Sequence, residues 1–206
     1  MKKRRTIYHI ILDKSGSMAD CSAKTIEGFN EQIGSIRAMQ AEFPEQDIQV
    51  GLTSFNENVD LHYFRQPVAV AKLLDEVSYH PKGSTALLDA IGSTSLRIEE
   101  SIREKADIPT AVMIVIITDG HENSSSLFTL EQVRNLIKRL ESTEKWTFNF
   151  LGAGINVQEV AESMAINAKY SRSFEKSHMK NQVWDHMNSS FRNHLQDFGK
   201  NEPLDK

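Results

Sequence analysis

The chain contains one cysteine, Cys21, among its 206 residues. A lone cysteine excludes an internal disulfide framework, and it excludes the CxxC motifs that hold zinc or carry out redox chemistry. Proteins without disulfides are typical of reducing compartments. We therefore expect a cytoplasmic protein whose only clear metal chemistry uses oxygen ligands.

Long apolar runs are also absent. No stretch of the sequence reaches the roughly 18 to 20 apolar residues of a membrane span. The basic start, Met1–Arg5, is similar to the first part of a signal peptide, but the apolar run Ile7–Leu12 is too short and contains His9. No small-residue cleavage site follows that run. The sequence favours a solvated basic cap before a first buried strand, with no membrane association.

The chain lacks a strong excess of either charge, because 24 Lys and Arg against 28 Asp and Glu give a net charge of −4. This balance argues against nucleic acid as the main partner. With 39% hydrophobic and 25% charged residues, the composition is that of a globular protein with one sizeable core. At about 150 residues per domain, this length predicts one domain, which we expect to be a monomer.

Short apolar and alternating segments predict the strands of a sheet. Thr6–Leu12 and Ala111–Ile117 are rich in β-branched residues, and the second is apolar throughout, which is typical of a central parallel strand covered on both faces. Ile48–Leu52 and Val59–Tyr63 alternate on either side of Asn56–Asn58, which predicts an antiparallel hairpin. Further strands are expected over 146–151 and, at an edge, over 170–174.

Helical periodicity separates these strands. Apolar residues spaced by three or four predict helices over 26–39, 87–102, 130–140 and 179–195, and a short one over 70–77. Thr129 and Gln132 form a capping box before one of them. Strands alternating with helices define an α/β fold. We predict a mostly parallel central sheet with one antiparallel edge strand and helices on both faces.

Acidic and hydroxyl side chains gather where the predicted strands end, the place where open α/β sheets bind ligands. Asp13 follows the first strand and Asp119 follows the apolar strand. Ser15 and Ser17 alternate with Asp13 in one tight loop, so all three side chains can point to the same side. Thr85 lies on a third polar loop, before a helix. These five oxygen-bearing side chains suit a hard cation such as Mg²⁺, which prefers about six ligands.

The segment Ile10–Met18 resembles the signature of von Willebrand factor type A domains, whose metal-ion-dependent adhesion site (MIDAS) begins Asp-x-Ser-x-Ser. The family also places a Thr on a second loop and an Asp on a third. Gly83–Leu87 and Ile117–Gly120 match those loops in the expected order. The resemblance implies a Rossmann-like A domain of the small stand-alone type found in bacteria and phages. The expected organisation is an A domain over 1–175, a C-terminal helix over 176–198 and a flexible tail over 199–206.

The resemblance further implies a divalent cation at all five positions, with a complete MIDAS. Ser15, Ser17 and Thr85 are then candidate direct ligands, while Asp13 and Asp119 act directly or through waters. We expect Mg²⁺, with Mn²⁺ or Ca²⁺ as alternatives. Hydroxyls and waters leave the ion residual positive charge, so an Asp or Glu of a partner protein would complete its coordination. The family uses such a site for protein binding, not for catalysis.

Several residues beside the predicted site are candidates for contact with that partner, with a solvated loop or core packing as the alternative explanation. They are Lys14, His121, Glu122 and the exposed-looking apolar residue Met18.

Two other functions stay open. A strand-terminal Asp with Mg²⁺ also begins the mechanism of haloacid-dehalogenase-type phosphohydrolases. Those enzymes usually show Asp-x-Asp, and Ser15 replaces the second Asp here, which removes the expected general acid. No GxSxG elbow, Walker A loop or convincing Ser/His/Asp set is present. We therefore expect no enzymatic activity. The third possibility is a scaffold protein that binds partners without metal.

Overall fold

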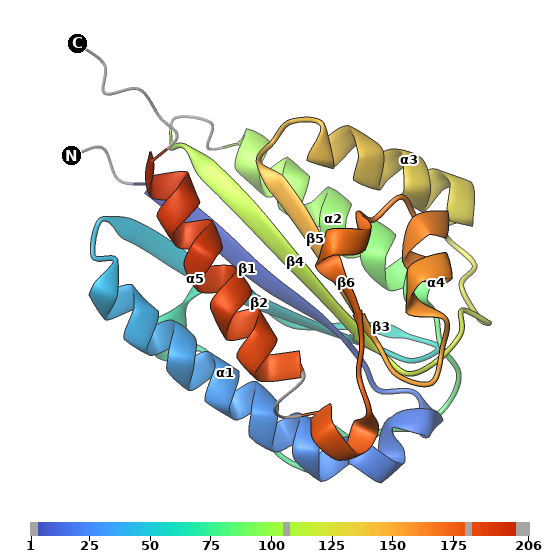
Figure 1. Ribbon diagram of the computed structural model, residues 1–206. Coiled ribbons are helices and arrows are strands. Elements are labelled where there is room, and N and C mark those ends of the chain that lie inside the picture. Colours follow the sequence, from blue (N-terminus) through green and yellow to red (C-terminus); the bar gives the residue numbers. More distant parts are fainter. Residues whose placement is uncertain (1–3, 105–107, 180–182, 201–206) are drawn as a thin grey trace.

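A six-stranded sheet forms the centre of the molecule in the computed structural model, which describes residues 4–104, 108–179 and 183–200. The strand order is β3-β2-β1-β4-β5-β6 (Figure 1). Only the pairing of β3 with β2 is antiparallel, so the predicted parallel sheet with one antiparallel edge strand is confirmed. The strands are β1 (Arg4–Asp13), β2 (Gln46–Phe55), β3 (Val59–Pro67), β4 (Thr110–Thr118), β5 (Trp146–Gly152) and β6 (Ser171–Ser173).

Helices cover both faces of this sheet (Figure 1). One face carries α1 and α5, whose apolar side chains share a core with the sheet. The other face carries α2, α3 and α4, which share a second core. The helices are α1 (Ser22–Glu42), α2 (Leu87–Arg103), α3 (Leu130–Glu141), α4 (Val157–Ser163) and α5 (Asp185–Lys200). Short 3₁₀ turns span Gly16–Cys21, Val68–Val70, Ala168–Tyr170 and Lys176–His178.

The two cores explain why β1 and β4 are apolar on both sides. In β1, Ile10 and Leu12 point into the core under α1 and α5, while Ile7 and Ile11 point into the opposite core. Every residue of β4 is buried. Alternate side chains of a strand point to opposite faces, so a strand between two helical layers needs apolar residues at nearly every position. This burial fixes the strand ends, and with them the loops that carry the polar residues.

The capping box before α3 is present as predicted. The Gln132 backbone N–H donates to Thr129 Oγ1 at 3.2 Å, and the Thr129 backbone N–H donates to Gln132 Oε1 at 2.8 Å. These reciprocal bonds satisfy two backbone donors that the helix itself leaves unpaired.

The short helix predicted over 70–77 is wrong, because only the 3₁₀ turn Val68–Val70 forms there. Side chains of α1 supply the hydrogen bonds that a helix would otherwise make. The Asn30 amide donates to the Leu74 carbonyl at 2.9 Å and accepts from its N–H at 2.8 Å. Arg37 donates to the carbonyl of Ala71 and to that of Val68, just before the segment. These bonds satisfy part of the segment's backbone without helical structure.

The C-terminal part of the chain crosses the sheet beside α1 (Figure 1). The predicted apolar stripe is buried in the core, and its residues are Met179, Val183, Met187, Phe191 and Leu195. The Tyr8 ring of β1 meets the Phe191 ring edge to face, with their centroids 4.6 Å apart. Most of the tail predicted from residue 199, namely 201–206, lies outside the described residues.

Within the described part of the chain, no helix combines the length and the apolar character needed to cross a membrane.

Candidate metal centre

The candidate site lies at the carboxyl ends of β1 and β4, where the strand order reverses. The chain runs from β1 to β2 on one side, whereas β4 lies on the other side of β1. Asp13 is the last residue of β1 and Asp119 directly follows β4. The register pairs Leu12 with Ile117, so the two aspartates leave adjacent strands together. Open α/β sheets bind ligands at such a reversal.

Asp13 is completely buried and held at both carboxylate oxygens. Oδ1 accepts the Ser15 backbone N–H at 2.6 Å, and Oδ2 accepts the Thr118 hydroxyl at 2.6 Å. The Tyr79 hydroxyl donates to the Asp13 carbonyl at 2.7 Å, which fixes the start of the loop. The carboxylate therefore has a defined orientation before any ligand arrives.

The two serines of the Asp-x-Ser-x-Ser segment point to the same side, as predicted. The Oγ atoms of Ser15 and Ser17 are 3.1 Å apart. Ser17 Oγ donates to Asp119 Oδ1 at 2.5 Å, which joins the β1 loop to the β4 loop. Ser15 is buried and Ser17 is exposed, so the cluster reaches from the interior to the surface.

Thr85 completes the group from a third loop. A Cβ atom added to Gly120 would lie 2.9 Å from Thr85 Oγ1 and 3.6 Å from Asp13 Oδ2, so the hydroxyl and the carboxylate approach each other across this glycine. The Gly16 backbone N–H donates to the Gly83 carbonyl at 3.0 Å and ties this loop to the first. The structure therefore brings all five predicted site residues together.

The donor set of the cluster fits a hard divalent cation. Two carboxylates and three hydroxyls converge, and oxygen ligands of this kind suit Mg²⁺, Mn²⁺ and Ca²⁺. Among the described residues no group of three or more His, Cys, Asp or Glu is placed to hold a metal ion, so the hydroxyls are an essential part of the set. Burial and the nearby charge of Asp119 raise the pKa of Asp13, against the hydrogen bonds from Thr118 and Ser15. A bound cation would instead favour the ionised carboxylate.

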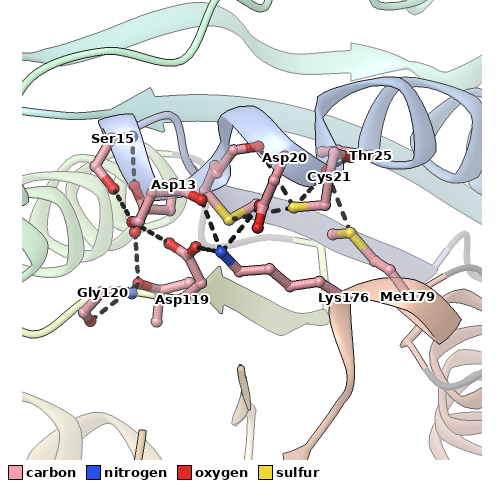
Figure 2. Close-up of polar contacts among 12 residues, drawn as sticks. Asp13, Ser15, Asp20, Cys21, Thr25, Asp119, Gly120, Lys176 and Met179 are labelled. Carbon is pink, nitrogen blue, oxygen red and sulfur yellow. Dashed lines mark hydrogen bonds and ion pairs between the residues drawn. The ribbon is translucent and has the colours of Figure 1, made fainter. Parts of the chain in front are cut away.

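Lys176 also reaches this cluster, although the sequence did not predict it (Figure 2). Its Nζ lies 2.5 Å from Asp119 Oδ2, and it donates to the Ser17 carbonyl at 2.7 Å and to Asp20 Oδ1 at 3.0 Å. Partial burial acts to lower the pKa of Lys176, but the bonds to Asp119 and Asp20 outweigh it and the pKa is raised. Lys176 lies far along the chain on a polar segment, and no local pattern marks it. Thr118, by contrast, directly precedes Asp119 and was within reach of sequence reasoning.

The candidate partner contacts lie in different environments. Lys14 forms an ion pair with Asp60 of β3. His121 is exposed beside the site. Met18 is fully buried in the core, so its candidacy as a partner contact is wrong and the alternative, core packing, is confirmed; the 3₁₀ turn after Ser15 folds it inward.

Glu122 holds its own loop against α2. Its two oxygens accept four hydrogen bonds, whose donors are the backbone N–H groups of Leu88, Ser124 and Ser125 and the Ser125 hydroxyl. These contacts give Glu122 a structural function in the described conformation.

Solved structures with this fold come from varied sources, all at low sequence identity. Proximal thread matrix protein 1 from the mussel byssus, described with a zinc-occupied MIDAS motif, gives a TM-score of 0.57 at 12% identity over 96% of this chain and 48% of that chain. The manganese-loaded TRAP protein of Plasmodium vivax gives 0.57 at 15% identity over 87% and 72%. BatB from Bacteroides thetaiotaomicron, a conserved hypothetical protein, gives 0.51 at 12% identity over 96% and 99%. The chain spans about half the length of the byssus protein.

These likenesses establish the fold, and the sequence itself establishes the family. No curated protein matches the chain. The family model of the von Willebrand factor type A domain matches residues 9–188, which include the second half of β1, the five site residues and most of the sheet. The chain belongs to the von Willebrand factor type A domain family.

Proposed function

We propose that the chain is a divalent-cation-dependent protein-binding module. The observation that carries this proposal is the convergence of two carboxylates and three hydroxyls from three loops at the reversal of strand order. Ser15, Ser17 and Thr85 would hold the ion through their hydroxyls, with Asp13 and Asp119 acting directly or through water. These five residues would form a complete MIDAS.

The proposed ion is Mg²⁺, with Mn²⁺ or Ca²⁺ as alternatives. The relatives described with zinc and with manganese support a divalent ion at this position of the fold. Hydroxyl ligands leave the ion more positive charge than carboxylates would. The exposed position of Ser17 lets a partner approach, so an acidic side chain of the partner can complete the coordination.

Binding is favoured over catalysis by the chemistry of the loop. A phosphohydrolase of haloacid-dehalogenase type needs a second carboxylate as general acid, and that position carries Ser15, whose hydroxyl lies against Ser17. We therefore propose no enzymatic activity. A phosphatase assay with generic substrates contradicts this if it finds turnover that Asp13→Asn abolishes.

We also propose that the protein acts in the cytoplasm as a monomer and is an A domain of bacterial or phage type. The cytoplasmic location is supported by the absence of a disulfide framework, since Cys21 is the one cysteine and is buried as a free thiol.

Calorimetric titration with MgCl₂ and MnCl₂ tests the proposed site. The parent should bind one ion, and Asp13→Ala and Asp119→Ala should bind none. Asp60→Ala is a matched control, because it removes an exposed aspartate that contacts Lys14 but no site residue. A parent that binds no divalent ion, or aspartate variants that bind as the parent does, contradicts the proposal and favours a metal-independent scaffold.

Affinity capture with and without EDTA then tests partner binding. The expected result is a protein retained in Mg²⁺, released by EDTA and not retained by the Asp13→Ala variant. Retention that ignores both EDTA and the variant contradicts a metal-dependent interaction.

A further inference from the structure

Lys176 places a positive charge at the edge of the candidate metal site (Figure 2). Its Nζ pairs with Asp119 Oδ2 at 2.5 Å, while Asp119 Oδ1 accepts the Ser17 hydroxyl at 2.5 Å. The same ammonium group donates to the Ser17 carbonyl at 2.7 Å. Lys176 therefore contacts two of the five site residues, from an element far away in the sequence.

The segment that carries Lys176 is fixed against the start of α1. Lys24 Nζ donates to the Ser177 carbonyl at 3.0 Å, and the buried Thr25 hydroxyl lies 3.2 Å from Met179 Sδ. Met179 itself is completely buried. These contacts hold the backbone that follows Lys176, so the fold directs the Lys176 side chain toward Asp119.

The charge balance of the site depends on this ammonium group. Asp13 and Asp119 supply two negative charges, and the ammonium group of Lys176 offsets one of them. A divalent cation among the hydroxyls would lie within a few ångströms of a second positive charge. The two positive charges repel each other, and partial burial of the lysine limits the screening of that repulsion by solvent.

We propose that Lys176 is a built-in cation of this site, which weakens divalent cation binding and leaves the loaded site one charge more positive. The inference rests on the proposed function, since it deepens the account of the same site. With Lys176 in place, the two carboxylates, the lysine and the ion sum to a net charge of +1. Without the lysine the sum is zero. The extra charge makes an acidic partner group the natural complement of the loaded site.

The C-terminal segment is coupled to the site by the same contact. An ion that binds at Ser17 and Asp119 competes for the oxygens that hold Lys176, so metal binding weakens the attachment of the turn Lys176–His178. The turn leads to Met179 and the apolar stripe of the C-terminal helix. Metal binding therefore changes the contacts of the turn Lys176–His178, which supplies no ligand to the ion.

Calorimetric titration with MgCl₂ on three variants tests this role. Lys176→Met removes the charge but keeps an unbranched side chain of similar length, and it should bind Mg²⁺ about tenfold more tightly than the parent. Lys176→Arg keeps the charge and should bind close to the parent value. Lys24→Met is the matched control, because it breaks the neighbouring tether to Ser177 without touching Asp119, and its Mg²⁺ affinity should be unchanged.

Hydrogen exchange supplies a second readout that does not depend on affinity. Mg²⁺ should speed exchange of the His178 amide, which donates to the Glu175 carbonyl at 2.8 Å, in the parent but not in Lys176→Met. Circular dichroism checks that each variant is folded.

The outcomes separate this inference from the proposed function. Unchanged or weaker Mg²⁺ affinity in Lys176→Met overturns the role of Lys176 and leaves the metal site intact. If Lys24→Met also binds Mg²⁺ more tightly than the parent, the role of Lys176 is overturned, because loss of the tether to Ser177 would then explain the change in affinity. Absence of Mg²⁺ binding in the parent and in every variant overturns both. Tighter Mg²⁺ binding in Lys176→Met, with Lys176→Arg and Lys24→Met close to the parent value, supports the inference.

Discussion

Two pairs of acidic residues lie at the carboxyl end of the sheet, and they are satisfied in different ways. Asp89 and Glu122 bind mainly backbone N–H groups. Asp89 accepts three of them, from Ser126, Leu127 and Phe128, and Glu122 accepts three more and one hydroxyl. Asp13 and Asp119 instead bind mainly side chains, namely two hydroxyls and the Lys176 ammonium group, with one backbone N–H at Asp13.

The chemistry of the donor decides what each pair can do. A backbone N–H can only donate a hydrogen bond, and its direction is fixed by the chain. A carboxylate that accepts from several N–H groups therefore stays in place and stabilises the loop that carries them. A hydroxyl can rotate and offer a lone pair to a cation while it still contacts its neighbour. Asp89 and Glu122 therefore stabilise the loop that carries Asn123 and leads to α3. Asp13 and Asp119 form a site whose hydrogen bonds can be replaced by bonds to a cation.

The substitution Asp89→Asn is expected to have the largest effect. The new amide group would direct N–H donors at backbone N–H donors, so at least one of the three bonds is lost inside a buried site. We expect a loss of about 3 kcal/mol in the free energy of unfolding. Urea denaturation measures it, and the loss should be equal with and without Mg²⁺. A variant as stable as the parent contradicts the structural function of this pair.

The corresponding substitution in the second pair, Asp13→Asn, should not lower the free energy of unfolding in the absence of Mg²⁺. The pKa of Asp13 is raised, so its ionised form costs stability in the metal-free fold at pH 7. An amide keeps the shape and removes that cost, and the Thr118 hydroxyl can turn to accept from it. We expect stability equal to or above that of the parent without Mg²⁺.

The effect of Mg²⁺ on the same variant completes the comparison. At a free Mg²⁺ concentration of 100 times the dissociation constant, the parent should gain about 2.7 kcal/mol and Asp13→Asn almost nothing. Urea denaturation in each buffer measures both values. An equal gain in the two proteins contradicts the assignment of Asp13.

The substitution Gly120→Ala should sharpen the contrast with a smaller effect. Its Cβ would press on Thr85 Oγ1 at 2.9 Å and displace the hydroxyl from the cluster. We expect Mg²⁺ binding to weaken by about 1 kcal/mol, roughly fivefold, with folding little changed. Gly34→Ala is the control, since a Cβ there meets nothing within 4 Å and should leave Mg²⁺ binding unaltered. Unchanged affinity in Gly120→Ala removes Thr85 from the site.

The sequence was sufficient to predict those features that depend on local chemistry. The apolar runs predicted β1 and β4, and the alternation around Asn56–Asn58 predicted the antiparallel edge strand, because burial on one or two faces leaves a direct pattern. Asp-x-Ser-x-Ser predicted that Ser15 and Ser17 share one side of the loop, since a tight turn imposes that geometry. The reversal of strand order then brought Asp119 and Thr85 to the same place.

Features that depend on contacts with distant parts of the chain could not be predicted from the sequence. Lys176 is one of many exposed-looking lysines until the fold places it beside Asp119. The segment after β3 has apolar residues at helical spacing, but Asn30 and Arg37 of α1 bond the backbone of Val68, Ala71 and Leu74 in a non-helical conformation. Met18 lies in a polar stretch of the sequence, and it is buried in the core because the 3₁₀ turn folds inward. Each of these depends on a neighbour that only the tertiary structure provides.

Diffraction from crystals grown in MnCl₂ would locate the bound ion independently of its affinity, because Mn²⁺ scatters anomalously. The proposed metal site predicts one strong anomalous peak among the hydroxyls of Ser15, Ser17 and Thr85, at about 2.0 to 2.3 Å from the coordinating oxygens. A peak confined to another part of the surface, or a protein with no ordered Mn²⁺ at saturating concentration, would contradict it.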